Sequence, residues 1–252
     1  MRSDLLTLSR RALLVAGACL LSVPAFVQDG ALAQDAAKKI RIGVIGSGNI
    51  GGTIGTLWVK DGHEVMFSSR HPETLKPMID ALGDKAKAGT PEEAIAFGDA
   101  VFVAVPYKAY PELSKSYAAA LKGKVVLDAG NATKARDGEL YDEVQANGIG
   151  ATSEKYFPGA KLVRAFNAAN YKVFAKEGAN GGKDRAGGRM AIPIAGDDAG
   201  AVKVAEGLVR DAGFDPVLVG GLKDASKFAM GSPGFGHEQT APDLRKTLGL
   251  AQ

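Results

Sequence analysis

The residues best suited to chemistry in this sequence form a glycine-rich turn, and they suit the binding of phosphate groups. The turn is Gly46-Ser47-Gly48-Asn49-Ile50-Gly51, a G-x-G-x-x-G pattern. Gly46 permits a tight turn, Gly48 lets the backbone approach a pyrophosphate, and Gly51 lets the following helix pack closely against a strand. Free backbone N–H groups at the start of that helix would face the negative phosphates. The pattern therefore predicts a dinucleotide site.

The segments on both sides of the turn matter, because a chain with 33 glycines produces such spacings by chance. Residues 40–45 are an apolar run rich in β-branched residues, as in a strand. Apolar side chains at positions 50, 54, 57 and 58 then fall on one face of a helix, which Gly62 ends. Residues 64–67 have the pattern of the next strand. This order of elements is the context that the motif requires, so nucleotide binding is favoured over a purely structural turn.

The end of the second predicted strand indicates which dinucleotide is bound. An NAD site needs an Asp or Glu about 20 residues after the glycines, to accept hydrogen bonds from the ribose hydroxyls. This chain has Ser68, Ser69 and Arg70 there, and no acidic residue before Glu73. Hydroxyls and a guanidinium bind a 2′-phosphate, which a carboxylate would repel. The sequence therefore predicts NADP, held in part by these three residues. The alternative is that Arg70 merely lies on the surface and Lys76 supplies any charge.

Strand and helix patterns alternate along the rest of the chain. Further strands are predicted at 86–88, 100–105, 124–128, 161–166, 190–195 and 216–219, and helices at 74–82, 90–98, 109–120 and 198–212. The run at 100–105 is nearly all apolar, as expected of a parallel strand buried on both faces. This alternation predicts a doubly wound, mostly parallel α/β sheet of the Rossmann type. We expect a single domain with its core at 39–227 and a short carboxyl-terminal extension at 228–252.

Further candidate residues follow the predicted strands, at the sheet edge where open α/β folds bind ligands. Val105 and Pro106 are predicted to contact the cofactor. The amides of Asn131 and Asn167 could frame the nicotinamide carboxamide and are candidates for a catalytic role, although an asparagine after a strand is often a turn residue. His237, the only histidine far from the glycine motif, is a third catalytic candidate as a general acid, or else a loose tail residue. Hydride transfer between flat rings needs positioning and exclusion of water rather than a nucleophile.

Two aromatic side chains and one loop have more than one interpretation. Tyr107 and Phe166 either stack on a bound ring or pack in the core, and the core is favoured for Phe166. Residues 179–189 are glycine-rich and basic. A solvated connection is the ordinary interpretation of such a loop, and a lid over an anionic substrate or the cofactor phosphates is the sharper one.

Four stretches within residues 39–227 resemble the F420H2:NADP oxidoreductase family, to which the metalloreductase domains of the STEAP type are similar. They are IGSGNIGGTIGTLWVKDGHEVMFSSR, DAVFVAVPYKAY, KLVRAFNAAN and IPIAGDDAGAVKVAEGLVRDAGFDPVLVGGL. The resemblance implies a single Rossmann domain that moves hydride between NADPH and a flavin or deazaflavin. The family positions that hold NADP match Ser47, Gly48, Asn49, Ile50, Ser69 and Arg70, and its strand-four motif matches Val105-Pro106. The tail departs from the family, which usually ends in a leucine-rich helix.

The first 33 residues have the features of an export signal. Ser9-Arg10-Arg11-Ala12-Leu13-Leu14 is a twin-arginine pattern, an apolar run continues to Val27, and Ala31-Leu32-Ala33 is a cleavage site. We expect a mature chain of residues 34–252 that is periplasmic or extracellular and is not inserted in a membrane, with an uncleaved anchor as the alternative. Cys19 is the only cysteine. The mature chain would therefore have no disulfide, no catalytic thiol and no cysteine-ligated metal.

Charge and length argue against several other classes of protein. Without the first 33 residues, 28 Lys and Arg face 26 Asp and Glu, a balance that argues against nucleic acid as a partner. Beyond residue 33 the chain has three histidines and no cysteine, which argues against a dedicated metal site. Only 33 residues follow Val219, too few for the helical substrate domain of 3-hydroxy acid dehydrogenases. Two functions remain: an NADP-dependent oxidoreductase with a small-molecule or flat, F420- or flavin-like redox partner, and a non-catalytic NADP-binding or redox-sensing module. A homodimer is compatible with either.

Overall fold

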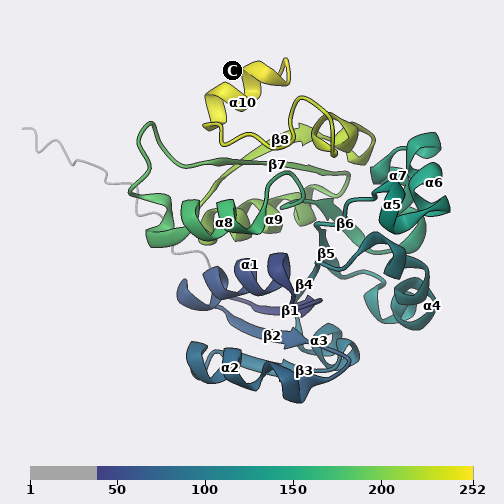
Figure 1. The fold of residues 1–252 in the computed structure, drawn as a ribbon, viewed down its shortest axis with the longest axis vertical. Coiled ribbons are helices and arrows are strands. Elements are labelled where there is room, and N and C mark those ends of the chain that lie inside the picture. The colour runs from purple at the N-terminus through teal and green to yellow at the C-terminus, as the bar shows by residue number, and fades with distance from the viewer. Residues whose placement is uncertain (1–38, 252) are drawn as a thin grey trace, which may run out of the picture. The chain divides into compact units, whose positions relative to one another are not determined.

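The computed structural model describes residues 39–251, so the predicted signal lies outside the described residues. The described residues form an eight-stranded sheet with helices on both faces (Figure 1). The strands are β1 Arg41–Ile45, β2 Glu64–Ser68, β3 Ala86–Gly89, β4 Ala100–Val103, β5 Val125–Asp128, β6 Lys161–Arg164, β7 Ala191–Gly196 and β8 Asp215–Gly220. The helices are α1 Asn49–Lys60, α2 Lys76–Leu82, α3 Pro91–Phe97, α4 Tyr110–Leu121, α5 Lys134–Asp137, α6 Glu139–Asn147, α7 Ile149–Tyr156, α8 Tyr171–Glu177, α9 Ala199–Asp211 and α10 Ala241–Thr247.

The strand order is β3-β2-β1-β4-β5-β6-β7-β8. The first six strands are parallel, β7 is antiparallel to β6, and β8 is parallel to β7. The order of connection reverses between β1 and β4, and open α/β sheets bind ligands outside the carboxyl ends of the strands at such a point. The prediction of a doubly wound, mostly parallel Rossmann sheet is confirmed.

The reversed direction of β7 is a detail that the alternation of strands and helices does not predict. Arg164, the last residue of β6, pairs with Ala195 near the end of β7. The connection between these strands contains one helix of seven residues, α8, and the loop 179–189. It returns the chain to the sheet at the edge that it left. As a result β7 begins beside the end of β6 and runs the opposite way.

Alternate residues of the strands bury two separate apolar clusters, one on each face of the sheet. In β4, Phe102 joins the cluster that also contains residues of α1, α8 and α9. Val101 and Val103 join the cluster that also contains residues of α3, α4 and α7. All four residues of β4 are buried, which explains why its sequence is apolar throughout.

Helix α1, which begins within the glycine motif, is fixed by close contacts. Trp58 is fully buried, and its Nε1 donates to the carbonyl oxygen of Leu208 in α9 at 2.7 Å. Its ring meets that of Phe102 edge to face, with 5.2 Å between centroids. Gly55 lies against β2, since a Cβ at this position would be 2.3 Å from the ring of Phe67. These contacts hold the amino end of α1 at the sheet edge where β1 ends.

The region 134–156 and the tail contain helices that the sequence pattern does not predict. Helices α5, α6 and α7 occupy the first of these regions, between β5 and β6. In the tail, Leu244 of α10 is 3 % exposed and packs with Ala191 and Val217 of the last two strands. The extension is therefore packed against the sheet. Within residues 39–251, no helix has the length and hydropathy required to span a bilayer.

Candidate functional site

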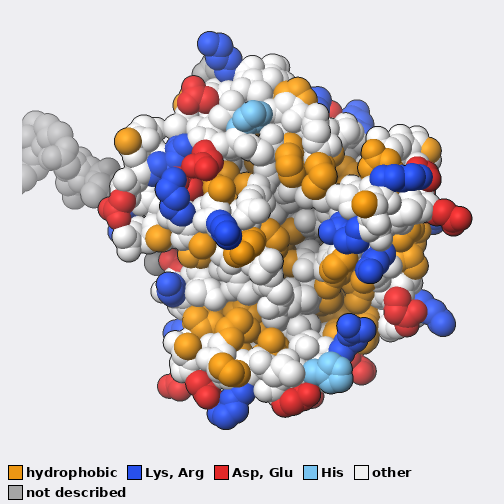
Figure 2. All heavy atoms as spheres, viewed as in Figure 1, with side chains coloured by type: hydrophobic (Ala, Val, Ile, Leu, Met, Phe, Trp, Pro, Cys, Tyr) orange, Lys and Arg blue, Asp and Glu red, His pale blue; other side chains and the backbone are white. Residues whose placement is uncertain are grey.

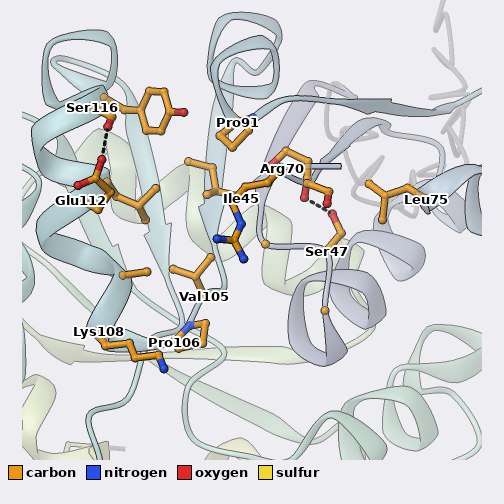
Figure 3. Close-up of a pocket in the computed structure, with 17 residues that line it drawn as sticks. Ile45, Ser47, Arg70, Leu75, Pro91, Val105, Pro106, Lys108, Glu112 and Ser116 are labelled. Carbon is orange, nitrogen blue, oxygen red and sulfur yellow. Dashed lines mark hydrogen bonds between the residues drawn. The ribbon is translucent and has the colours of Figure 1, made fainter. Parts of the chain in front are cut away.

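A cavity of about 820 Å³ opens where β1, β2 and β4 end (Figure 3). Most of the residues predicted to bind the cofactor line it: Gly46, Ser47, Gly48, Ser68, Ser69, Arg70, Val105 and Pro106. Asn49 lines a neighbouring cavity of about 490 Å³ that shares Ser47 and Gly48 with the first. Ile50 and Gly51, also predicted, line neither cavity. The structure thus brings the two predicted halves of the NADP site, the turn and the end of β2, to one cavity.

The glycine turn has the geometry that phosphate binding requires. Gly46 has φ +93°, and a Cβ there would lie 2.5 Å from a methyl carbon of Val105. A Cβ on Gly51 would lie 1.9 Å from the carbonyl oxygen of Gly46, so this glycine serves helix packing. A Cβ on Gly48 would meet nothing within 4 Å, so the backbone there faces open space. Gly48 is also the N-cap of α1 and supplies no side-chain cap. The first amides of the helix are therefore available to an anion.

Two serines join the turn to the end of β2. The hydroxyl of Ser47 donates to the carbonyl oxygen of Ser68 at 3.0 Å (Figure 3). The Oγ of Ser68 is buried and has no hydrogen-bond partner among residues 39–251. Leaving a buried hydroxyl without a partner costs about 1–3 kcal/mol. Although Ser68 lines the cavity, this Oγ has almost no accessible surface, so a ligand oxygen reaches it only if the side chain rotates.

Arg70 points its guanidinium into the cavity, toward Val105 (Figure 3). Its side chain is exposed, and no residue in the described part of the chain forms a hydrogen bond or an ion pair with it. Lys76, the alternative source of positive charge, pairs with Asp80 at 2.9 Å and does not line the cavity. Arg70 is therefore the better placed of the two cations to bind a 2′-phosphate.

A single carboxylate lines the cavity among the described residues, and it belongs to Glu112 of α4. The hydroxyl of Ser116 donates to it at 3.2 Å, on the wall that α4 forms across from the glycine turn (Figure 3). The end of β2, where an NAD site holds its acidic residue, contributes serines and an arginine instead. Lys108 lines the same cavity and is exposed.

The structure also brings Asn131 and Asn167 together, beyond the ends of β5 and β6. The Nδ2 of Asn131 donates to the carbonyl oxygen of Asn167 at 2.7 Å. The Nδ2 of Asn167 donates to Oδ1 of Asn131 at 3.3 Å and to the carbonyl oxygen of Phe228 at 3.1 Å. Asn131 is half-buried and Asn167 is buried. Figure 2 shows a hollow over the region where β4, β5 and β6 lie in Figure 1, with apolar side chains beside it.

Behind these asparagines, a buried ion pair joins the ends of β5 and β6. The Nη1 of Arg164 lies 2.5 Å from Oδ2 of Asp128, and its Nη2 donates to the carbonyl oxygen of Gly130 at 2.6 Å. Neither charged side chain has exposed surface. Burial alone lowers the pKa of Arg164, but the Asp128 carboxylate outweighs this effect and the pKa is raised. Sequence reasoning missed this pair. The sequence feature that could have revealed it is that β5 and β6, two apolar strands that pair with each other, each end in a charged residue.

Tyrosines complete the buried network. The hydroxyl of Tyr110 donates to the Asp128 carboxylate, and burial followed by the charge of Asp128 raises the pKa of Tyr110 well above its ordinary value. Tyr107 is fully buried and stacked on Tyr110, with 4.2 Å between ring centroids. Its hydroxyl lies 3.1 Å from Oγ of Ser153. Stacking of Tyr107 on a bound ring is therefore excluded.

Phe166 lies in the core, as the sequence favours. It is 1 % exposed and meets Trp58 and Phe102 edge to face. Its φ is +58°, a region that non-glycine residues seldom adopt. Strained backbone of this kind persists where the surrounding packing imposes it, and it is concentrated at ligand sites. Phe166 directly precedes Asn167.

The tail crosses the end of β6 beside this region. The N–H of Gly236 donates to the carbonyl oxygen of Ala168 at 2.7 Å. His237 follows and is exposed. A catalytic role for His237 stays a prediction.

The basic loop 179–189 lies apart from the cavity at the glycine turn. Lys183 and Arg189 line a separate cavity of about 720 Å³ beside the carboxyl end of α1. Arg185 pairs with Glu177 at 2.6 Å. The loop is therefore not placed as the lid over the cofactor phosphates that its composition suggests.

One group of described residues has the spacing of metal ligands: donor atoms of Asp61, His63 and Asp211 lie within 4.8 Å of one another. Lys39 forms ion pairs with both carboxylates. Because the ammonium already supplies positive charge there, we interpret the group as an ion-pair network. It ties the start of β1 to the ends of α1 and α9.

Comparison with known proteins agrees with this geometry. Residues 41–132, which include the glycine turn and the end of β2, match the family described as NADP oxidoreductase, coenzyme F420-dependent. The match confirms the predicted cofactor, NADP. The family resemblance found in the sequence is borne out for this segment.

Relatives and solved structures extend the similarity over most of the chain. Metalloreductase STEAP3 of Rattus norvegicus is 30% identical over 197 residues, 78% of this chain and 37% of the relative. Human metalloreductase STEAP2 is 25% identical over 200 residues, 79% of this chain and 37% of the relative. This chain thus spans well under half the length of these relatives.

Two solved structures share the fold. A hypothetical protein of Sinorhizobium meliloti has a TM-score of 0.64 and 24% identity, covering 81% of this chain and 96% of its own. A candidate F420-dependent NADP reductase of Arthrobacter has a TM-score of 0.64 and 22% identity, covering 80% and 99%. At identities below 25%, the similarity shows a shared fold and no more.

Proposed function

We propose that this chain is an NADP-dependent oxidoreductase that transfers hydride between NADP(H) and a flat redox partner of the flavin or F420 type. The observation that carries the proposal is the end of β2, where the exposed guanidinium of Arg70, which has no partner among residues 39–251, lines a cavity beside the glycine turn. A 2′-phosphate can bind this guanidinium, and a pyrophosphate can accept hydrogen bonds from the first amides of α1.

The residues of this chain contribute binding and orientation. When bound, NADPH supplies the hydride. The first amides of α1 hold the pyrophosphate, and Arg70 with Ser69 holds the 2′-phosphate. Val105 and Pro106 add apolar surface where β4 ends, and this surface keeps water away from the bound cofactor.

A flat acceptor suits the rest of the sheet edge. The side chains that follow β5 and β6 are the amides of Asn131 and Asn167, which do not titrate. The charged groups behind them, Asp128 and Arg164, are paired and without exposed surface. A flavin or deazaflavin takes up hydride without a nucleophile from the protein, and the hollow in Figure 2 has apolar sides that suit such a ring. The description of the matched family, NADP oxidoreductase, coenzyme F420-dependent, supports a redox acceptor of this type.

The test is to mix purified protein with NADPH and, separately, F420, FMN, FAD and quinones. We expect NADPH absorbance to fall only when a flat acceptor is present. NADPH that binds but is oxidised by none of the acceptors would support the non-catalytic NADP-binding module instead. Calorimetry that detects no binding of NADP+ would contradict both functions.

We further propose that the protein acts outside the cytoplasm, on the basis of the twin-arginine pattern at Arg10 and Arg11 and the cleavage site that ends at Ala33. Cell fractionation should find the shortened chain in the exported fraction. The double substitution Arg10→Lys and Arg11→Lys should keep it in the cytoplasm, and export of that variant at the ordinary level would contradict the proposal.

A further inference from the structure

We propose that Asn131 recognises the carboxamide of the nicotinamide and that Asn167 is its positioning residue. This inference rests on the proposed function, because it assigns the ring-binding half of the same site.

Asn131 has unused hydrogen-bonding capacity that matches an amide ligand. A side-chain amide has two N–H donors and an oxygen with two lone pairs. Asn131 uses one donor on the carbonyl oxygen of Asn167, at 2.7 Å, and one lone pair on Nδ2 of Asn167, at 3.3 Å. One N–H and one acceptor position remain, on a residue that is only half-buried. A primary carboxamide offers the complementary acceptor and donor, so the two amides can pair through two hydrogen bonds.

Asn167 fixes the orientation of the Asn131 amide. Its backbone oxygen needs a donor and its Nδ2 needs an acceptor, so only one of the two flipped states of Asn131 satisfies both. The amide of Asn167 is itself fixed because Nδ2 also donates to the carbonyl oxygen of Phe228 at 3.1 Å. The Oδ1 of Asn167 is buried without a partner in the described part of the chain. A buried polar atom left in this state needs an explanation, and holding Asn131 in one orientation supplies it.

The backbone before each asparagine is held by buried contacts. Gly130 precedes Asn131, and its carbonyl oxygen accepts from Nη2 of the buried Arg164 at 2.6 Å. Phe166 precedes Asn167 and holds the strained φ of +58° within the aromatic cluster. Strain that packing imposes next to a side chain with unmet hydrogen bonds indicates a ligand site.

The position of Asn131 suits the far half of a dinucleotide. In the order β1-β4-β5, β5 lies two strands from the glycine turn, roughly 10 Å at the usual strand spacing. A nicotinamide riboside that extends from a pyrophosphate at the turn passes the end of β4, at Val105 and Pro106, and reaches the end of β5. Figure 2 shows the face hollowed over these strand ends.

Calorimetry with three ligands tests the inference. Adenosine 2′,5′-bisphosphate has the 2′-phosphate but no nicotinamide, and nicotinic acid adenine dinucleotide phosphate has a carboxylate in place of the carboxamide. Asn131→Ala should weaken NADP+ about tenfold, a loss of about 1.4 kcal/mol, and leave the bisphosphate within twofold. The unaltered protein should prefer NADP+ to the nicotinic acid analogue, and Asn131→Ala should remove that preference.

The positioning role of Asn167 has its own readout. Asn167→Ala should reduce the preference for NADP+ over the nicotinic acid analogue while the affinity for the bisphosphate is kept, which a loss of folding would not do. Asn170→Ala is the matched control, because Asn170 lies three residues away and only caps α8, accepting from the N–H of Lys172 at 2.9 Å. It should change none of the three affinities.

The outcomes separate this inference from the proposed function. If Asn131→Ala binds NADP+ normally, or loses both NADP+ and the bisphosphate equally, the inference is overturned while NADP binding stands. If the unaltered protein binds neither ligand, the proposed function fails and the inference fails with it. The analogue preference keeps the test decisive where a variant is less stable, because it compares two ligands on one protein.

Discussion

Two arginines stand beyond or at the ends of strands in one sheet, and their surroundings are opposite. Arg70 follows β2, is exposed in the cavity, and has no partner among residues 39–251. Arg164 ends β6, has no exposed surface, and binds both the carboxylate of Asp128 and the carbonyl oxygen of Gly130. Both Nη atoms of Arg164 have partners within the protein, although its Nε is buried without one among residues 39–251. The guanidinium of Arg70 is available for a ligand. Whether a guanidinium has partners within the protein therefore separates structural residues from ligand-binding residues, which the residue type alone does not do.

The neighbours of the two arginines follow the same division. Beside Arg70, the buried Oγ of Ser68 has no partner among residues 39–251. Around Arg164, the hydroxyls of Tyr110 and Tyr107 both have partners. We therefore expect substitutions at the paired groups to reduce the free energy of unfolding, and substitutions at the unpaired groups to reduce the affinity for NADP.

The largest effect is expected from Arg164→Met, which leaves the Asp128 carboxylate buried and unpaired. Breaking one side of a buried ion pair costs about 3–5 kcal/mol. Urea denaturation should show that loss, whereas Arg210→Met, which breaks an exposed pair with Glu206, should change the free energy of unfolding by less than about 1 kcal/mol. If Arg164→Met left the free energy of unfolding unchanged, the structural role assigned to Arg164 would be wrong.

Arg70→Ala should have the complementary effect. Hydrogen bonds to a charged group contribute about 1.5–3 kcal/mol, so the affinity for NADP+ should fall by roughly 10- to 100-fold. The affinity for NAD+, which lacks the 2′-phosphate, and the free energy of unfolding should stay nearly the same. Calorimetry with both nucleotides measures the difference. Lys76→Ala is the control, since Lys76 pairs with Asp80. If that variant, rather than Arg70→Ala, lost the preference for NADP+ over NAD+, Lys76 would be the cation that binds the 2′-phosphate.

The division between site and scaffold also explains what could be predicted from the sequence. The strand, turn and helix of residues 40–62 are specified locally, by apolar periodicity and by glycines that each meet a local steric need. The site groups at the end of β2 follow directly in the chain, so their place beside the turn could be inferred. Val105 and Pro106 could be inferred as well, because parallel strands bring their carboxyl ends to one edge.

What the sequence could not provide depends on contacts between distant segments. The pairing of Asp128 with Arg164 requires β5 and β6 to be neighbours, and each residue alone resembles an ordinary charged residue at a strand end. The direction of β7 depends on the edge at which the connection after β6 brings the chain back to the sheet. The hydrophobic pattern of the sequence does not show this. The reciprocal amides of Asn131 and Asn167 were foreseeable as two candidates, but their hydrogen bonds were not.

Two glycines of the turn differ in the same way, since one serves packing and the other faces the site. A Cβ on Gly51 would clash with the carbonyl oxygen of Gly46 at 1.9 Å, so Gly51→Ala should lower the free energy of unfolding by about 1–3 kcal/mol. A Cβ on Gly48 would meet open space, so Gly48→Ala should cost less than about 1 kcal/mol, the difference between Gly and Ala at the N-cap of a helix. It should nevertheless weaken NADP+, because the methyl group occupies the space of the pyrophosphate. Thermal unfolding and calorimetry on both variants check the two effects, and equal stability losses would contradict the distinct roles.

The smallest effect is expected at Asp211, a paired carboxylate remote from the glycine turn. Burial alone raises the pKa of Asp211, but the hydrogen bond from His63 and the charge of Lys39 outweigh this effect, and the pKa lies below its ordinary value of 3.8. A carboxyl whose pKa is depressed by folding stabilises the protein above its unfolded pKa, and this contribution is lost as the pH falls through the folded value. Asp211→Asn should therefore cost about 1 kcal/mol at neutral pH and show a smaller loss of stability below about pH 4 than the unaltered protein. Asp80→Asn, which alters an exposed ion pair, should lose stability at low pH to the same extent as the unaltered protein. Since Asp211 does not line the cavity at the glycine turn, Asp211→Asn should leave the affinity for NADP+ unchanged. A changed affinity would mean that groups paired within the protein also contribute to NADP binding.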